Sequence, residues 1–329
     1  MLAPRTGHTL ARLIGAAEAP LTLRGLVEAG ADRLPLPGAG RTLERWQMLA
    51  LIAAYDLSLV KLYEGHTDAL AILAELGAPE PAAGSRWGTW CAEPPDARVT
   101  LDADGRLNGT KAWCSGAGEL THAVMSCWNP KGEPCLVAVS LDQQGVNITC
   151  AGWEAVGMAA TRSADVHFDR AEATPLGAPG DYVRRAGFWQ GGAGIAACWY
   201  GGAQGIADMT HRLAGSNPDS HRLAHLGAIA VALAGAAALL RETADWIDLQ
   251  PHADARGPAL RVRLAVEQAA GEVLLHAGRA LGAAPLCRNA RFARAMADLP
   301  VFLRQSHAER DLAALGGLVA TSSETSWTL

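Results

Sequence analysis

The spacing of apolar residues changes along the chain, and its first zone has the pattern of helices. Between residues 1 and 84 apolar positions recur at spacings of three and four, as on one face of a helix. The clearest run covers residues 42–63, with Thr42 as its expected N-cap. A second helix is expected from Thr67 to Leu76, and Gly77 ends it. These residues predict an N-terminal helical domain over 1–84.

The second zone, residues 85–178, has the pattern of strands. Short stretches alternate between apolar and polar residues, which is typical of strands with one buried face. Pairs and groups of turn-forming residues separate them: Asp104-Gly105, Asn108-Gly109, Asn129 to Gly132, and Gln144-Gly145. This zone predicts a central antiparallel β-barrel or sandwich.

The third zone, residues 179–329, returns to helical spacing and predicts a C-terminal helical bundle. Long periodic segments run from Leu226 to Trp246, from Pro258 to Leu281 and from Asn289 to Leu315. The apolar stretch from Leu226 to Leu240 is too short to span a bilayer and is interpreted as a buried core helix. Helices, then strands, then helices indicate an α+β protein with a β domain between two helical ones.

Composition and charge narrow the class further. Half of the 329 residues are apolar and 19% are charged, as in ordinary globular proteins. The net charge of −5 argues against a nucleic-acid partner. The seven cysteines are scattered, without the spacing of metal ligands. We expect reduced thiols, no metal site, no membrane segment and a cytoplasmic location.

Three motifs in the strand zone carry chemical information. They read WGTWCAEPP at 87–95, LNGTKAWCSGA at 107–117 and VGMAATRSADVHFD at 156–169. In this order and spacing they resemble the acyl-CoA dehydrogenase superfamily of flavoproteins. The order of helices, barrel and helices is also that of the family. The resemblance implies an acyl-CoA dehydrogenase-like fold over most of the chain.

The resemblance also implies a flavin cofactor, FAD. Trp113 would cover one face of the flavin ring, and the Ser115 hydroxyl would bond its edge. The turn that begins with Trp90 and Cys91 would offer backbone N–H groups, and Arg222 stands one position from the family's phosphate-binding arginine. The alternatives are a core tryptophan in the barrel for Trp113 and an ordinary turn hydroxyl for Ser115.

The usual catalytic base of the family has no counterpart here. Dehydrogenases of this type remove an α-proton with a glutamate near the C-terminus, but that position falls near Ala313. We therefore consider His307, Glu309 and Glu64 as candidate catalytic residues. The alternative for the first two is a charge-paired helix face. For Glu64 it is an ordinary turn between helices.

Substrate recognition is altered as well. The places where many family members hold CoA are Trp189 and Gly192. Candidate substrate-binding residues are His66, Trp199 and Tyr200, with packing between helices as the alternative for the last two. The run GAGIAA at 192–197 resembles a dinucleotide-binding motif, but no strand pattern precedes it and no βαβ unit follows.

Three hypotheses for function follow from the resemblance. The first is an FAD-dependent oxidoreductase that oxidises an acyl thioester, on CoA or a carrier protein, with a non-standard base. The second is a flavin-dependent monooxygenase of the same fold, in which reduced flavin meets oxygen and no carboxylate base is needed. The third is a non-catalytic scaffold. The family also implies a homodimer or homotetramer and, for an oxidoreductase, an electron-transfer partner.

Overall fold

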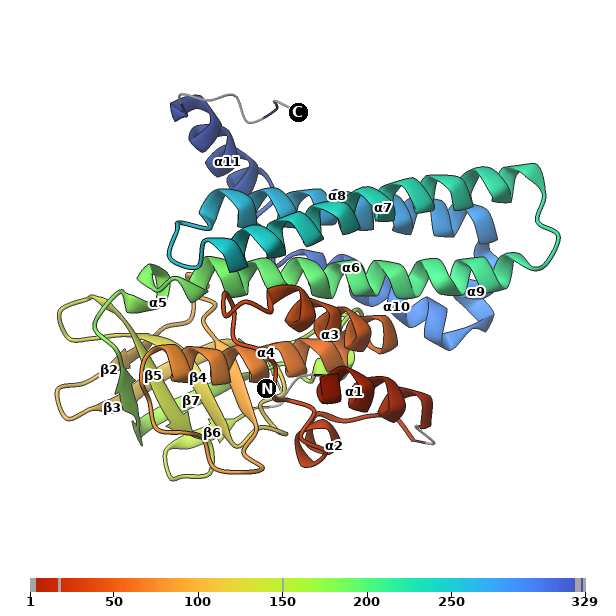
Figure 1. Cartoon of the computed structure of the whole chain (residues 1–329). Helices are drawn as coiled ribbons and strands as arrows, with labels where there is room; N and C mark the ends of the chain where they lie inside the picture. Colours follow the sequence, from red (N-terminus) through yellow and green to blue (C-terminus); the bar gives the residue numbers. More distant parts are fainter. Residues whose placement is uncertain (1–3, 17–18, 150, 323–326, 328–329) are drawn as a thin grey trace. The chain divides into compact units, whose positions relative to one another are not determined.

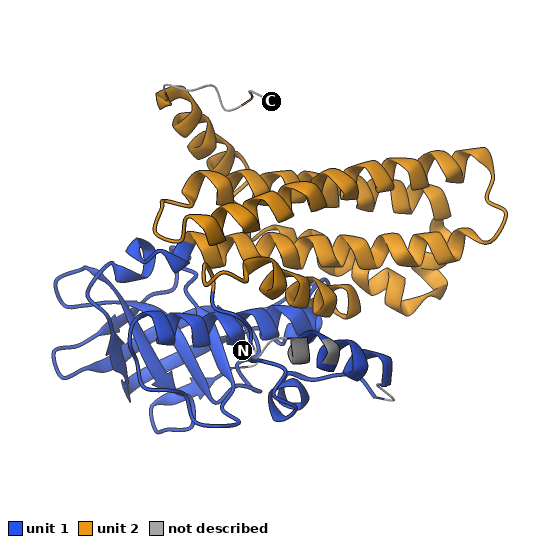
Figure 2. Cartoon of the chain, viewed as in Figure 1, with its two compact units in different colours: residues 1–36, 58–188 blue, residues 37–57, 189–329 orange. Residues whose placement is uncertain are grey.

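A computed structural model describes residues 4–16, 19–149, 151–322 and 327 of the chain. Its internal contacts divide it into two compact units, coloured separately in Figure 2. The first, here called the sheet unit, comprises Met1–Leu36 and Ser58–Phe188. The second, the helical unit, comprises Pro37–Leu57 and Trp189–Leu329. The first helical zone of the sequence therefore contributes to both units.

The helices before the sheet follow the predicted pattern, with one break. Those outside the helical unit are α1 (Pro4–Ala16), α2 (Leu23–Glu28) and α4 (Leu57–Glu75). The prediction of a single helix over residues 42–63 is wrong. Asp56 is extended (φ −158°) and separates α3 (Thr42–Tyr55) from α4. Thr67, the expected first residue of a second helix, lies inside α4. The predicted stop is confirmed, since Gly77 is left-handed just after α4.

A curled mixed sheet forms the rest of the sheet unit (Figure 1). Its strand order is β6-β7-β3-β2-β4-β5-β8, and β1 runs parallel to β4. The predicted fold class is confirmed, and two parallel pairings, β1 with β4 and β2 with β4, are additions to it. The strands are β1 (Trp87–Trp90), β2 (Val99–Leu101), β3 (Arg106–Cys114), β4 (His122–Trp128), β5 (Pro134–Ser140), β6 (Val146–Ile148), β7 (Ala164–Glu172) and β8 (Thr174–Leu176).

One predicted turn lies inside a strand. The Asn108-Gly109 pair, expected to reverse the chain, belongs to β3. Gly109 is required there for another reason: its φ is +119°, and a Cβ atom would collide with the carbonyl oxygen of Arg98. Glycine thus permits the close approach of two backbones within the sheet.

The sheet packs against α4. Buried side chains on α4 contact buried side chains from four strands: Ala69, Ile72 and Leu73 pack with Trp87, Val124, Leu136 and Leu176. Burying apolar area of this kind is the main stabilising term in folding. The short helix α5 (Asp181–Arg184) follows β8.

The helical unit contains α3, α9 (Ala283–Arg288) and five further helices. These are α6 (Gly187–Ala214), α7 (Ser220–Leu249), α8 (Arg256–Leu281), α10 (Ala290–Leu303) and α11 (Glu309–Thr321). The helix expected from Asn289 to Leu315 is therefore two helices, separated at residues 304–308. Thr42 is the first residue of α3 and not its N-cap, and its hydroxyl donates to the carboxylate of Asp248 on α7 (2.6 Å).

Helix α7 departs from its prediction as a buried core helix. It has 30 residues and is long and apolar enough to cross a membrane by length and composition alone. Only 22% of its most apolar stretch is buried, and Val231 is 74% exposed. Helix α11 carries no buried residue. The chain by itself therefore leaves apolar helix surface uncovered.

Candidate functional site

Two strained turns meet in the sheet unit. One is at the end of β3, where Trp113 has φ +59°. The other is the loop before β7, where Met158 (φ +58°) and Arg162 (φ +45°) flank a 3₁₀ turn at 159–161. These are three of the five non-glycine residues with left-handed φ in the described part of the chain. Each such residue costs about 1–2 kcal/mol, and strain of this kind clusters at functional sites.

Trp113 presents its ring to solvent. Its side chain is 52% exposed, whereas its neighbours Ala112 and Cys114 are buried. The pairing of β3 with β7 is irregular between Lys111 and Cys114, so the strand is distorted where the tryptophan lies. A half-exposed indole held by a strained backbone offers a flat apolar surface on which an aromatic ring can stack.

A chain of hydroxyl groups lies beside Trp113. The Ser115 Oγ is 3.1 Å from the Ser163 Oγ, which is 2.9 Å from the Thr161 Oγ1. The Thr161 hydroxyl donates to the carbonyl of Met158 (2.8 Å). Thr161 and Ser163 are buried, while Ser115 is half-buried and forms the accessible end of the chain. The indole N–H of Trp90 donates to the Ser115 carbonyl (3.2 Å) and fixes that turn.

An ion pair between a buried lysine and a partly exposed glutamate supports β3 close to this turn. The Lys111 ammonium is 2% exposed and lies 2.6 Å from a carboxylate oxygen of Glu93. Lys111 also donates to the hydroxyl and carbonyl oxygens of Ser126. Burial would raise the pKa of the Glu93 carboxyl, but hydrogen bonds from Lys111, Ser126 and Trp128 outweigh it and lower the pKa. The ion pair ties the segment after β1 to β3.

Cys91, the residue after β1, has a thiol of low reactivity. Burial raises the pKa of its thiol to about 11. The thiol is therefore protonated at neutral pH and a poor nucleophile. All six cysteines that the structure describes are free thiols; Cys150 lies outside the described residues. Within the same residues no three His, Cys, Asp or Glu side chains cluster as metal ligands.

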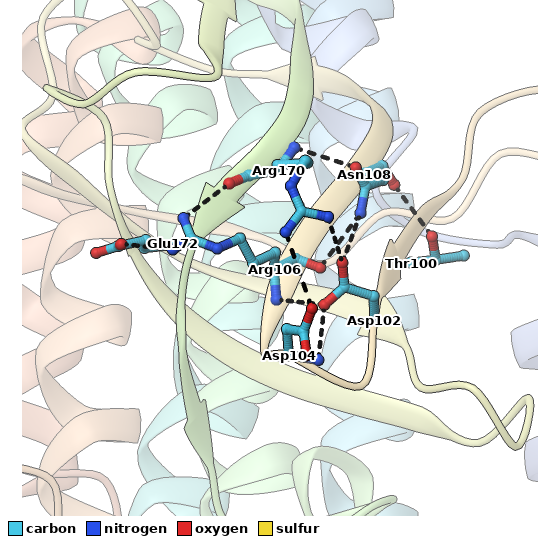
Figure 3. Close-up of polar contacts among 7 residues, drawn as sticks. All are labelled: Thr100, Asp102, Asp104, Arg106, Asn108, Arg170 and Glu172. Atoms are coloured by element: carbon cyan, nitrogen blue, oxygen red, sulfur yellow. Dashed lines mark hydrogen bonds and ion pairs between the residues drawn. The ribbon is translucent and has the colours of Figure 1, made fainter.

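A second polar cluster of the sheet unit has a structural role (Figure 3). Backbone hydrogen bonds, first from Arg106 and then from Asp104, hold the pKa of the Asp102 carboxyl below its usual value. Arg106 also pairs with Glu172 on β7 (3.0 Å). Asp104, Arg106 and Glu172 border an open cavity of about 470 Å³. The charged groups of this cluster pair with one another and thereby support the β2–β3 turn. None of the charged groups drawn in Figure 3 is therefore available for a ligand.

The predicted residues His307 and Glu309 lie at the start of α11. The backbone N–H of His307 donates to Asp311 (3.1 Å), and its Nδ1 is 3.4 Å from the other carboxylate oxygen. The imidazole is exposed, and Asp311, four residues further along the chain, holds it. Ala308 between them is left-handed (φ +45°). Glu309 is exposed in the first turn of the helix.

Trp199 and Tyr200 lie within the helical unit. The Trp199 side chain is fully buried, and its indole N–H has no hydrogen-bond partner among the described residues. The guanidinium of Arg263 lies 5.0 Å from the centre of its ring. Tyr200 is half-buried, and burial raises the pKa of its hydroxyl. Arg222, in the first turn of α7, lies 3.7 Å from the helix-capping carboxylate of Asp219.

The other two candidates, Glu64 and His66, lie on α4. Glu64 pairs with Lys61 (3.2 Å). His66 is fully buried, and both ring nitrogens are engaged: Nδ1 accepts the N–H of Trp87 (3.1 Å), and Nε2 faces Asp32 (3.1 Å). The structure therefore brings together Trp90, Trp113 and Ser115. It also adds Ser163 and Thr161, which the third motif contains but which sequence reasoning left without a role.

Comparisons with known proteins agree with this architecture. No protein-family model and no curated protein matches the sequence. Solved structures do match. KijD3 in complex with FMN and a dTDP-linked amino sugar has a TM-score of 0.79 and 19% identity, over 99% of this chain and 94% of that chain.

Two monooxygenases match equally well. The methanesulfinate monooxygenase MsuC from Pseudomonas fluorescens has a TM-score of 0.78 and 21% identity, over 99% of this chain and 98% of its own. The dibenzothiophene monooxygenase TdsC from Paenibacillus sp. A11-2, in complex with FMN and indole, gives 0.79 and 20%, over 97% and 96%. The protein thus has the acyl-CoA dehydrogenase-like fold, which these flavoproteins share.

The residues present fit a flavin. A flavin needs a flat apolar surface for its ring and polar atoms at the ring edge. In the sheet unit Trp113 offers the first, since half of its indole is exposed. Ser115 offers the second, since it is half-buried, whereas the two hydroxyl residues that follow it, Ser163 and Thr161, are buried. Trp113 and Ser115 both belong to the second motif, LNGTKAWCSGA at 107–117.

Proposed function

We propose that this protein is a flavin-dependent monooxygenase that uses reduced FMN. When bound, reduced flavin supplies the two electrons with which oxygen is split between substrate and water. Substrate, O₂ and reduced flavin thereby give oxygenated substrate, water and oxidised flavin. The names of MsuC and TdsC, and the FMN in the KijD3 and TdsC complexes, support monooxygenation and FMN over FAD.

The observation that carries the proposal is the half-exposed Trp113 beside the Ser115 hydroxyl. Trp113 would position the ring, since half of its indole is exposed at the distorted, left-handed end of β3. Ser115 would bond the ring edge. The ion pair between buried Lys111 and partly exposed Glu93 would hold the preceding part of β3 in place.

The distribution of carboxylates favours oxygenation over oxidation of an acyl thioester. Oxidation needs a base at the substrate's α-carbon, and the only acid on α6, Asp208, is exposed. Asp311 is committed to His307, and the family's usual place for the base holds Ala313. Oxygenation needs no such base. His307, oriented by Asp311, is our candidate for the residue that donates or accepts a proton.

The uncovered apolar helices favour self-association. We propose a homodimer or homotetramer in which a second copy covers α7 and α11, rather than a membrane protein with α7 in lipid. An electron-transfer partner, a flavin reductase, would supply the reduced flavin in the cytoplasm.

Oxygen-isotope labelling tests the proposed function. The protein would be mixed with reduced FMN and a panel of sulfinate, thiophene, indole and amine substrates under ¹⁸O₂, and the products analysed by mass spectrometry. Incorporation of one ¹⁸O atom into a product supports the proposal. If an acyl thioester instead bleaches bound oxidised flavin without oxygen, the protein is a dehydrogenase. A protein that binds no flavin is a scaffold.

A further inference from the structure

We propose that Thr161 and Ser163 fix the direction of the Ser115 hydroxyl, so that Ser115 offers a ligand only lone pairs and the site prefers reduced to oxidised flavin. This inference rests on the proposed function and concerns the redox state in which the cofactor is recognised. Thr161 and Ser163 are positioning residues, because they act through Ser115.

The direction follows from counting hydrogens. A hydroxyl group has one hydrogen to donate. Thr161 gives its hydrogen to the Met158 carbonyl (2.8 Å), which has none to give back. In its contact with Ser163 (2.9 Å) Thr161 must therefore accept, and Ser163 must donate. Ser163 has then spent its hydrogen, so it accepts from Ser115 (3.1 Å).

Ser115 is left with lone pairs alone. It can accept a hydrogen bond from a ligand, but it cannot donate one without breaking its bond to Ser163. A ligand atom that meets the Ser115 oxygen must therefore carry a hydrogen. The oxidised flavin ring carries a single N–H group, at N3, whereas N1 and N5 are bare acceptors. Reduction adds a hydrogen at N5, so it increases the number of ring positions that suit Ser115.

The surroundings of the three hydroxyl groups oppose a reversal of the direction in which they donate hydrogen bonds. Thr161 is 2% exposed and Ser163 is 7% exposed, so no bulk water replaces a broken bond. The N–H of Gly116 donates to the Thr161 carbonyl (2.9 Å), which ties the two turns together. Left-handed residues on both sides of the 3₁₀ turn fix its backbone. A reversal would break the bond from the Thr161 hydroxyl to the Met158 carbonyl, which would keep only the backbone N–H of Thr161 (3.0 Å), and would form no new bond within the protein in exchange.

A matched pair of substitutions at Thr161 tests the proposal. Thr161→Val keeps the shape of the side chain but removes the hydroxyl, so that Ser163 is free to donate to Ser115 and Ser115 to donate to a ligand. Thr161→Ser keeps the hydroxyl and serves as the control. Dissociation constants for oxidised and reduced FMN are measured by anaerobic fluorescence titration, without substrate or turnover.

The expected result is a preference for reduced FMN in the wild-type protein and in Thr161→Ser. In Thr161→Val the ratio of the two dissociation constants falls by about fivefold to tenfold, the value of one hydrogen bond. For a two-electron couple this corresponds to a midpoint potential of bound flavin lower by about 20–30 mV. Ser163→Ala, which removes the acceptor of the Ser115 hydrogen, should shift the ratio in the same direction.

Ser163→Ala also keeps the test valid if Thr161→Val does not fold, which thermal melting would show. An unchanged ratio in folded Thr161→Val or Ser163→Ala overturns the inference and leaves the proposed function standing. A wild-type protein that prefers oxidised FMN overturns it as well. A protein that binds neither form contradicts the proposed function itself, and the inference falls with it.

Discussion

Replacing Trp113 by glycine and by alanine separates the strain at the site from its binding surface. Both substitutions remove the indole, so both should abolish stacking with a flavin. They differ in backbone preference. Glycine adopts the observed φ of +59° without a steric cost, whereas alanine does not. We expect the glycine variant to be the more stable of the two, which reverses the usual order within a strand.

The magnitude follows from the structure. The indole is 52% exposed, so its loss removes about 100 Å² of buried surface and about 2.5 kcal/mol in either variant. Left-handed backbone costs alanine about 1–2 kcal/mol. Against this, glycine loses about 0.5–1 kcal/mol through its greater chain entropy. The glycine variant should thus exceed the alanine variant in free energy of unfolding by about 0.75 kcal/mol, the difference between the midpoints of these two ranges.

Urea unfolding of the flavin-free proteins measures this difference. Asn147, exposed in the middle of β6 and not left-handed, serves as the control position. There the glycine variant should be less stable than the alanine variant by about 0.5–1 kcal/mol. If Trp113→Gly is also less stable than Trp113→Ala, the backbone at Trp113 is not strained, and the reasoning that places a functional site there is refuted.

Three further predictions concern the ion pair, the assembly and the proton donor. Glu93→Gln should cost about 3 kcal/mol in urea unfolding, more than Lys111→Met, because it strands a buried ammonium. Because the pKa of Glu93 is lowered in the folded protein, the stabilisation that its carboxylate provides is present at neutral pH and is lost as the pH falls through that pKa. Glu93→Gln should therefore reduce the dependence of the free energy of unfolding on pH in the acid range. An unchanged dependence would contradict the prediction. Val231→Glu places a charge on the exposed apolar face of α7 and should convert the proposed oligomer to monomers in sedimentation velocity. Gln250→Glu, which makes the same change in charge, should leave the oligomer intact. If Val231→Glu gives an oligomer of wild-type size, this face of α7 is not the interface. His307→Gln should lower turnover by about a hundredfold with flavin affinity retained, and full activity would remove His307 from the mechanism.

Much of the fold could be predicted because its signals are local. The turns at Asp104-Gly105 and Gln144-Gly145, and the stop at Gly77, depend on backbone preferences that a few residues encode. The break at Asp56 was not predicted, because neither proline nor glycine marks it. The apolar pattern of α7 allowed both a core helix and an interface helix at 227–240, because hydropathy indicates that a surface is buried but not whether the same chain buries it.

Only those residues of the candidate site that lie together in one sequence motif could be predicted. Trp113 and Ser115 lie in one motif, so their proximity is visible in the sequence. Ser115 and Ser163 are 48 residues apart, and their contact depends on how the loop before β7 folds against the end of β3. The direction of the hydroxyl chain depends further on the Met158 carbonyl. No local pattern encodes such an arrangement.

Flavin binding to two variants, each lacking one exposed tryptophan, tests the central claim most directly. FMN would be titrated into the wild-type protein, into Trp113→Ala and into Trp327→Ala, which removes another exposed tryptophan. The dissociation constant is read from the change in flavin absorbance and fluorescence. The account predicts that wild-type protein and Trp327→Ala bind alike, while Trp113→Ala binds at least tenfold more weakly. Equal affinity in all three proteins would contradict a flavin site at Trp113.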